Sequence, residues 1–423
     1  MRPVSVLARF SSVREATQLL VADLGVEDMV VQTMPDVSPT KWHLAHTSWF
    51  WETFLLRPYS QGYQEFSSEF NYLFNSYYNG IGARHARHER GFLSRPTLDR
   101  VLAYRAHVDD AMACLLSIDH GVENTAILEL VDLGLAHEEQ HQELILTDIK
   151  HVLSRHPFAP KAHPAPKVDP GEADDGPCGW VEFDGGTVEI GTGDGRFHFD
   201  NEGPRHQVIL TPFALADRLV SNRDYLEFIE DGGYRMAGLW LSDGWARVEA
   251  EGWTSPLYWH EGDEGWETFT LHGQQSLDLD APVTHLSYYE ASAFAEWSGA
   301  RLPDEREWEL GASTRRSVDG RFCTPGRSAH PGATPMHRNS GAGLRQMFGD
   351  VWEWTRSAYL PYPRFRPAPG AVGEYNGKFM CGQFVLRGGS CATAPGHVRT
   401  TYRNFFPPEA RWQFSGLRLA KDI

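Results

Sequence analysis

Two histidines one helical turn apart have the clearest chemical potential in this sequence. His137 and His141 end the segment HEEQH, and on an α-helix a spacing of four residues puts both imidazoles on one face, within reach of a single metal ion. The spelling also matches the HExxH of zinc metalloproteases, which need a third ligand downstream. Residues 144–171 contain no glutamate, which weakens the protease interpretation. The remaining alternative is a solvent-facing pair among neighbouring glutamates.

A second histidine-bearing segment, WHLAH, supplies a candidate third ligand. His46 lies one turn after Trp42 and one turn before Phe50, so on a helix it should point with them toward the interior, with His43 placed behind the ligands. Three neutral imidazoles leave positions open for an anionic thiolate and O2, which suits Fe(II). Zinc at the same residues would suit hydrolysis, and the sequence leaves the metal open.

A tyrosine pair and an arginine pair follow these segments. Tyr77 and Tyr78 precede an Asn-Gly turn, and Arg87 and Arg90 lie in the basic run RHARHER. Beside a metal, a phenol can deliver a proton without being a ligand, and two guanidinium groups can clamp a carboxylate. The alternatives are a structural tyrosine pair and a solvated basic face, and the local sequence by itself favours the solvated face.

The elements that must position these residues fall into two parts. Helical periodicity runs through residues 10–155, and it predicts a four-helix bundle over residues 1–155 whose interior can hold metal ligands. A linker rich in proline and acidic residues follows over 156–178. Short β-like runs, glycine-rich turns and many tryptophans then predict an irregular α+β domain over 179–423.

Composition narrows the choice of partners. The formal net charge of −17 argues against nucleic-acid and anionic-membrane partners, which such a surface would repel. The five cysteines are scattered without CxxC spacing, and no long apolar run or export signal occurs, so we expect free thiols and a cytoplasmic location. The sequence carries no signal for the oligomeric state.

Taken together, the motifs resemble those of one family. WHLAH and HEEQH, with GGTVEIG, LPDEREWE, GDVWEWT, RGGS and GLRLA, resemble the ergothioneine-biosynthetic sulfoxide synthases over nearly the whole chain. The resemblance implies a DinB-like four-helix bundle followed by a C-type-lectin-like, formylglycine-generating-enzyme-like α+β domain. It implies Fe(II) held by His46, His137 and His141. It also implies a reaction with O2 that joins a thiol to hercynine (N-α-trimethylhistidine) and oxidises the sulfur to a sulfoxide.

The resemblance also bears on the thiol donor. Members that use γ-glutamylcysteine carry an acidic residue after RNW near the C-terminus and a catalytic tyrosine before RGGS. Here Phe406 stands at the first position, and the second falls near Val372. The Tyr77-Tyr78 pair looks like that of members using free cysteine. We therefore expect cysteine as the donor, Tyr78 as the proton donor and Tyr77 as a positioning residue.

The same resemblance assigns the remaining substrate contacts. Arg87 and Arg90 would hold the carboxylate of the donor, and Gln140 would help to bind hercynine. Asn404, Phe405 and Phe406 would close the same pocket, where aromatic faces suit a quaternary ammonium group.

Several alternatives stay open at this point. Related chemistry would use γ-glutamylcysteine, histidine itself as in ovothiol synthesis, or a selenium donor. More distant alternatives are a DinB-type thiol transferase and a non-catalytic binding module. Formylglycine-generating enzymes carry two reactive cysteines after GGS, at positions that here are Thr393 and Val398, so their copper chemistry is not expected.

Overall fold

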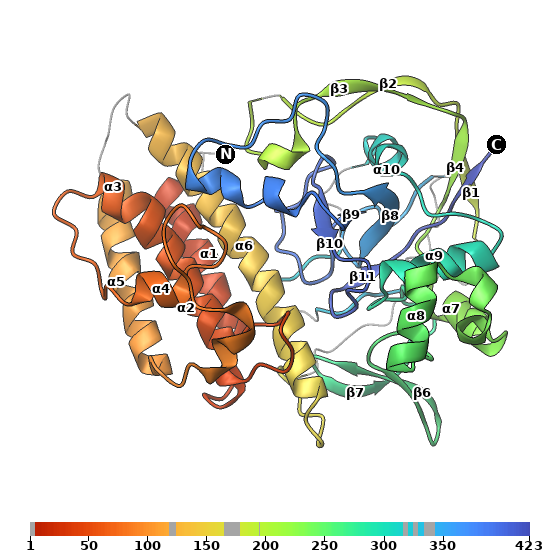
Figure 1. Ribbon diagram of the computed structural model, residues 1–423, viewed down its shortest axis with the longest axis horizontal. Helices are drawn as coiled ribbons and strands as arrows, with labels where there is room; N and C mark the ends of the chain where they lie inside the picture. The colour runs from red at the N-terminus through yellow and green to blue at the C-terminus, as the bar shows by residue number, and fades with distance from the viewer. Residues whose placement is uncertain are drawn as a thin grey trace. The chain divides into compact units, whose positions relative to one another are not determined.

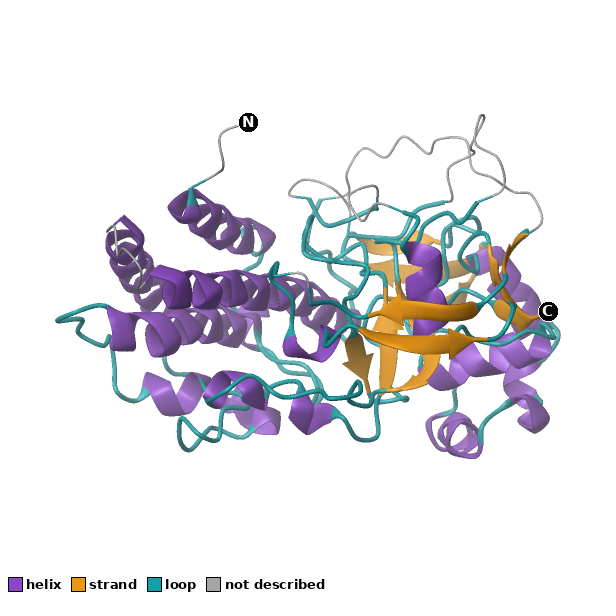
Figure 2. Cartoon of the chain, turned by 90° about the horizontal axis from the view of Figure 1, so that it is seen from above, coloured by secondary structure: helices purple, strands orange, loops and turns teal. Residues whose placement is uncertain are grey.

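The fold is described from a computed structural model, which covers residues 5–117, 124–164, 178–193, 195–315, 320–324, 329–333 and 343–423. Most of the linker expected over 156–178 lies outside these residues. The chain divides into two compact units. The first comprises Met1–His163 with Ala368–Tyr375, and the second comprises Pro164–Pro367 with Asn376–Ile423. Strands occur only in the second unit of the described chain (Figure 2).

Four long helices build the described part of the first unit. They are α1 (Val6–Leu20), α2 (Thr40–Trp51), α5 (Leu98–Ser117) and α6 (Asn124–Ser154), shown from red to yellow in Figure 1. Both α1 and α2 pack against α5 and α6, and every residue of α2 is buried. Close packing depends on Gly134 in α6, where an added Cβ would lie 2.5 Å from the Trp51 ring. Helix α2 is therefore the core helix of this bundle.

Shorter elements complete the helical unit. Helix α2 runs on into a π-helical turn (Glu52–Leu56) and α3 (Arg57–Tyr59), and α4 (Phe70–Phe74) precedes the tyrosine pair. A segment distant in sequence, Ala368–Tyr375, also belongs here, although the sequence pattern had placed it in the α+β domain. The carboxylate of Glu374 accepts the backbone N–H groups of Asn79 and Gly80 at 3.0 and 2.8 Å. These bonds attach the segment to the tyrosine turn.

Among its described residues, the second unit contains twelve strands in four small sheets. The strands are β1 (Trp180–Phe183), β2 (Gly186–Ile190), β3 (His206–Leu210), β4 (Phe213–Ala216), β5 (Trp259–Gly262), β6 (Gly265–Thr270), β7 (Gly273–Ser276), β8 (Trp352–Ala358), β9 (Phe384–Arg387), β10 (Asn404–Phe406), β11 (Ser415–Gly416) and β12 (Ala420–Asp422). The sheet orders are β1-β4-β12, β10-β9-β8-β11, β2-β3 and β5-β6-β7. The helices are α7 (Asn222–Glu230), α8 (Ser242–Glu251), α9 (Tyr288–Trp297) and α10 (Glu305–Ala312).

Three of the sequence motifs meet in one sheet of this unit. GDVWEWT leads into β8, RGGS begins at the end of β9, and GLRLA begins at β11, with β9 antiparallel and β11 parallel to β8. Gly416 is required because a Cβ there would lie 2.4 Å from the carbonyl oxygen of Val283. Gly388 and Gly389 have φ angles of 97° and 82°, a region that favours glycine. These motifs are thus fold determinants of the α+β unit.

Two expectations about chain chemistry can be checked directly. All five cysteines are free thiols, as their spacing predicted. Across the described residues, no helix combines the length and the apolar character needed to cross a bilayer.

Candidate metal centre

The three histidines named from the sequence lie together in the helical unit. His46 comes from α2, and His137 and His141 come from α6. One ring nitrogen from each lies within 4.8 Å of the other two. The Nε2 atoms of His46 and His137 are 3.2 Å apart. The helical spacing and the second histidine segment therefore produce one cluster of imidazoles.

The nitrogen chemistry of this cluster fits a divalent transition metal. The Nδ1 of His46 lies 2.6 Å from the carbonyl oxygen of Phe74, so it carries the proton and leaves Nε2 with its lone pair. The Nδ1 of His137 is buried and has no partner among the described residues. Burial lowers the pKa of His137 to about 3 and the pKa values of His46 and His141 well below their usual range. Three neutral imidazoles with converging lone pairs are suitable metal ligands.

Stacked rings hold the imidazole of His46 in place. Trp42 stacks on one side with ring centroids 4.6 Å apart and an interplanar angle of 11°, and Trp49 stacks at 5.4 Å and 17°. The guanidinium carbon of Arg90 lies 3.4 Å from the centroid of Trp42. His137 in turn stacks on Phe50 at 4.3 Å. Aromatic packing therefore fixes two of the three rings.

The glutamate of the HEEQH segment has a structural position. Glu138 is fully buried, and its carboxylate accepts from Arg14 at 2.9 Å, Arg105 at 3.2 Å, Trp51 at 2.9 Å and Thr17 at 2.8 Å. Although burial raises its pKa, the charges of the two arginines and the hydrogen bonds from Trp51 and Arg14 together lower it to about 2. A carboxylate held by four donors is not a general base, which removes the metalloprotease interpretation.

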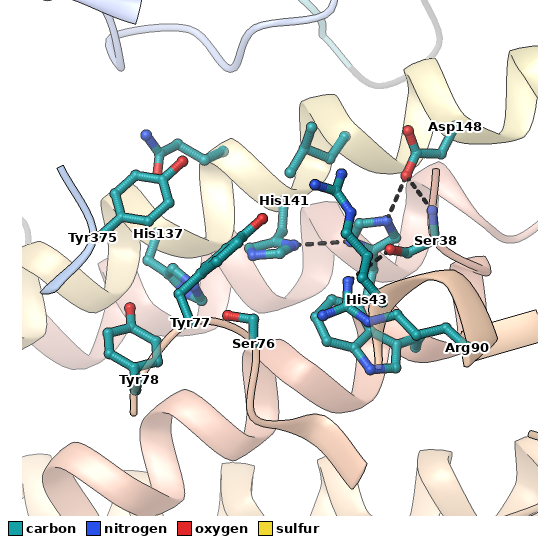
Figure 3. Close-up of a pocket in the computed structure, with 14 residues that line it drawn as sticks. Ser38, His43, Ser76, Tyr77, Tyr78, Arg90, His137, His141, Asp148 and Tyr375 are labelled. Atoms are coloured by element: carbon teal, nitrogen blue, oxygen red, sulfur yellow. Dashed lines mark hydrogen bonds and ion pairs between the residues drawn. The ribbon is translucent and has the colours of Figure 1, made fainter. Parts of the chain in front are cut away.

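A pocket opens beside the histidines (Figure 3). It is lined by Ser38, Trp42, His43, Ser76, Tyr77, Tyr78, Arg87, Arg90, His137, Gln140, His141, Leu144, Asp148 and Tyr375. Seven of the eight site residues predicted in the helical unit therefore line this pocket. The eighth is His46, whose ring lies against those of His137 and His141. Ser38 and Asp148 carried no sequence signal for a site.

One tyrosine of the pocket was not singled out from the sequence. The position of a catalytic tyrosine in relatives was placed near Val372, which suggested that this chain lacks the phenol. The structure instead places Tyr375 in the pocket, where its ring lies 5.7 Å from that of Tyr77. The turn Ala371–Glu374 is anchored through Glu374, and Tyr375 is the next residue along the chain. Burial raises the pKa values of Tyr78 and Tyr375, so both phenols stay protonated.

The arginine pair is not a solvated face. Arg90 is only 4% exposed, and its Nη1 donates to the hydroxyl of Ser38 at 2.9 Å. Arg87 donates to the carbonyl of Asp36. The Nε of each arginine is buried and has no partner among the described residues. Burial lowers the pKa of Arg90 to about 9, because its positive charge has few negative partners nearby. A substrate carboxylate bound in the pocket would supply such a partner.

Three predicted residues lie in the second unit. Asn404, Phe405 and Phe406 form β10, which pairs with β9. The ring of Phe405 stacks on Tyr359 with centroids 4.1 Å apart. Their contact with hercynine stays a prediction.

Comparison with known proteins identifies both units. Residues 9–145 match the DinB superfamily, and residues 169–423 match the sulfatase-modifying factor enzyme 1-like domain. The hercynine oxygenase of Mycolicibacterium smegmatis is 32% identical, with 97% of each chain covered. Those of Mycobacterium tuberculosis (31%, 96% of each chain) and Mycolicibacterium thermoresistibile (33%, 96% of this chain and 92% of the relative) are similar to the same extent. The chain belongs to the hercynine oxygenase family.

Membership confirms the recognition made from the motifs and the expected fold class. A DinB-like helical domain is followed by an α+β domain similar to formylglycine-generating enzymes. As a hercynine oxygenase family member, the protein is an oxidoreductase, and its cluster of three histidines suits a metal-dependent oxygenase.

Proposed function

We propose that this protein is an iron(II)-dependent sulfoxide synthase that joins L-cysteine to hercynine with O2, giving hercynylcysteine sulfoxide in ergothioneine biosynthesis. The observation that carries the proposal is the convergence of His46, His137 and His141 beside a pocket of tyrosines and arginines. The near-complete match to hercynine oxygenases supports the choice of substrate. The free thiols are in line with a cytoplasmic location.

The three imidazoles would hold the iron and add no negative charge to it. Bound there, Fe(II) would bind the thiolate of the donor and O2 together and would pass to O2 the electrons that the two substrates give up in C–S bond formation and sulfur oxidation. The protein's own contribution is to place the donor and hercynine side by side, which converts an encounter of two substrates into reaction within one complex.

Gln140 and β10 are the proposed hercynine contacts. Gln140 lines the pocket. Asn404, Phe405 and Phe406 would supply an amide and two aromatic faces, and aromatic faces attract quaternary ammonium groups. The trimethylammonium group has no N–H to donate, so its recognition has to come from such surfaces.

The arginine pair is the proposed clamp for the carboxylate of cysteine. Each guanidinium group has an Nε donor without a partner among the described residues. Arg87→Gln should therefore raise the KM for cysteine roughly 10- to 100-fold, since a hydrogen bond between charged groups contributes about 1.5–3 kcal/mol. The KM for hercynine should change little. Steady-state kinetics with each substrate varied in turn would measure this.

Arg95→Gln is the matched control, because Arg95 is exposed, does not line the pocket and donates to the carbonyl of Ser94 by a long bond of 3.4 Å. Its kinetics should equal those of the wild type. An unchanged KM for cysteine in Arg87→Gln, or a rise confined to hercynine, would show that the clamp is assigned wrongly.

Tyr78 is the proposed proton donor. Its phenol is buried, faces the pocket and is held protonated by a raised pKa. General acid catalysis contributes roughly 10²- to 10⁴-fold, so Tyr78→Phe should lower sulfoxide formation by about that factor and divert cysteine to its own oxidation product. Mass spectrometry of the products measures both effects.

Tyr375 is a second phenol in the same pocket, which makes Tyr375→Phe the informative comparison. The proposal expects the smaller loss in Tyr375→Phe and no loss in Tyr72→Phe, since Tyr72 is exposed. A large loss in Tyr375→Phe with little change in Tyr78→Phe would transfer the role to Tyr375.

The thiol donor is tested by competition. Equal concentrations of cysteine and γ-glutamylcysteine would be supplied with hercynine and O2, and the sulfoxide products separated by mass. The proposal expects the cysteine adduct to dominate, because the apolar Phe406 cannot pair with the ammonium group of a γ-glutamyl extension. Dominance of the γ-glutamyl adduct, or reaction with histidine in place of hercynine, would overturn the substrate assignment.

A further inference from the structure

A chain of buried polar groups extends from His141 along one wall of the pocket, which His43, Asp148 and Ser38 also line. The Nδ1 of His141 lies 2.8 Å from the Nδ1 of His43, and the Nε2 of His43 lies 3.0 Å from Oδ2 of Asp148 (Figure 3). His43 is 2% exposed and Asp148 is 3% exposed. The backbone N–H of Ser38 donates to the same carboxylate oxygen at 2.8 Å. Asp148 is therefore fixed from two directions.

We propose that His43 and Asp148 are positioning residues that fix the tautomer and ring orientation of His141, and so set the affinity of the three-histidine site for a divalent metal. This inference rests on the proposed function only in taking His141 as a metal ligand. The proposed function gives no role to His43 or Asp148.

The hydrogen-bond pattern dictates the tautomers. A carboxylate only accepts, so the proton on His43 has to be on Nε2. The Nδ1 of His43 then carries the lone pair and accepts, which makes the Nδ1 of His141 the donor. The Nε2 of His141 is left deprotonated, as metal coordination requires.

The three imidazoles are oriented in different ways. His46 donates to the backbone carbonyl of Phe74, and His137 stacks on Phe50. Of the three, only His141 bonds, within the described chain, to a side chain, His43, that itself bonds to a carboxylate, that of Asp148. Carboxylate groups behind metal-bound histidines raise ligand basicity and hold the ring in place. Here a second imidazole lies between the two, so the carboxylate acts through His43.

Binding of Co(II) to the full-length protein tests the proposal without catalysis. The dissociation constant would be measured by competition with a chelating dye. Loss of an outer-shell partner typically weakens metal binding roughly 10- to 100-fold, which we expect for His43→Leu and Asp148→Ala. His43→Gln should retain most of the affinity, because its amide can accept from His141 and donate to Asp148.

His151→Gln is the matched control for loss of a buried histidine. His151 lies on the same helix, bonds to Thr33 at 2.6 Å and does not line the pocket. Its Co(II) affinity should equal that of the wild type. Thermal unfolding of each metal-free variant shows whether the fold is kept. His43→Phe, which also lacks a hydrogen-bonding group, and Asp148→Asn, which lacks the charge, replace any variant that does not fold, and the same loss of affinity is expected of them.

A second readout reports the tautomer itself. In the Zn(II)-loaded protein labelled with ¹⁵N-histidine, the ring of His141 should show a proton on Nδ1 that is protected from exchange. His43→Leu should lose this protection, and His43→Gln should keep it.

Each outcome has a distinct meaning. Equal Co(II) affinity in the wild type, His43→Leu and Asp148→Ala, or a proton on Nε2 of His141, would overturn the inference and leave the proposed function standing. Absence of Co(II) binding by the wild-type protein would instead overturn the metal centre, and the proposed function with it.

Discussion

His137→Ala is expected to abolish metal binding and, with it, sulfoxide synthase activity. Loss of an outer-shell partner costs roughly 10- to 100-fold in affinity, so removal of one of three ligands should cost more than about 100-fold. His137 is the best ligand to remove because its Nδ1 has no partner among the described residues. His46, in contrast, bonds to Phe74 and stacks between two indoles, so its loss would also disturb the core. Metal content after dialysis and turnover would both be measured.

The control for this substitution is His107→Ala. His107 is a half-buried histidine of the same bundle that contacts the carbonyl of Gln64 and the rings of Tyr63 and Phe66, and it does not line the pocket. We expect it to keep the metal and the activity, while both variants unfold at temperatures near that of the wild type. Full metal occupancy and turnover in His137→Ala would mean that the cluster is not the metal centre.

Glu138→Ala should destabilise the protein by about 3–5 kcal/mol, the usual cost of removing one partner from a buried ion pair. Arg14 and Arg105 are buried, and both donate to this carboxylate. Without it their charges stay buried with less compensation. Urea unfolding of the metal-free protein, followed by circular dichroism, would measure the loss.

Glu129→Ala provides the comparison on the same helix, since Glu129 is exposed and should change stability by less than about 0.5 kcal/mol. The experiment also separates two roles for the glutamate of HEEQH. If Glu138 were a general base, its removal would leave the stability normal and greatly reduce turnover. If Glu138 holds the two buried arginines, its removal reduces the stability, and the stability of Glu138→Gln should lie between those of the wild type and Glu138→Ala.

The sequence was most informative where the chemistry depends on local spacing. The interval between His137 and His141 determines that both rings share a helix face, and the change in texture after residue 178 separates helices from short strands. The prediction that His46 points inward rested on its neighbours Trp42 and Phe50. That argument was weaker, because every residue of α2 is buried and the helix has no exposed face to contrast with. The cluster itself depends on the packing of α2 against α6.

The sequence was least informative where contacts join distant segments. Tyr375 reaches the pocket because Glu374 binds backbone N–H groups almost 300 residues earlier, and backbone partners leave no mark in the sequence. The partners of Glu138 lie 124 and 33 residues away. Arg90 was placed in what reads as a solvated basic run, yet Trp42 covers its guanidinium group at 3.4 Å. Such contacts require the tertiary structure.

O2 uptake by the iron-reconstituted protein measures whether the three-histidine centre is an iron-dependent sulfoxide synthase. The purified chain would be loaded with Fe(II) without oxygen, supplied with cysteine and hercynine, and then mixed with O2 while consumption is recorded and the product weighed by mass spectrometry. We predict O2 consumption that requires iron and both substrates and yields one sulfoxide that contains both substrates. Equal uptake and product from metal-free protein, or no coupled product from the iron-loaded protein, would contradict this prediction.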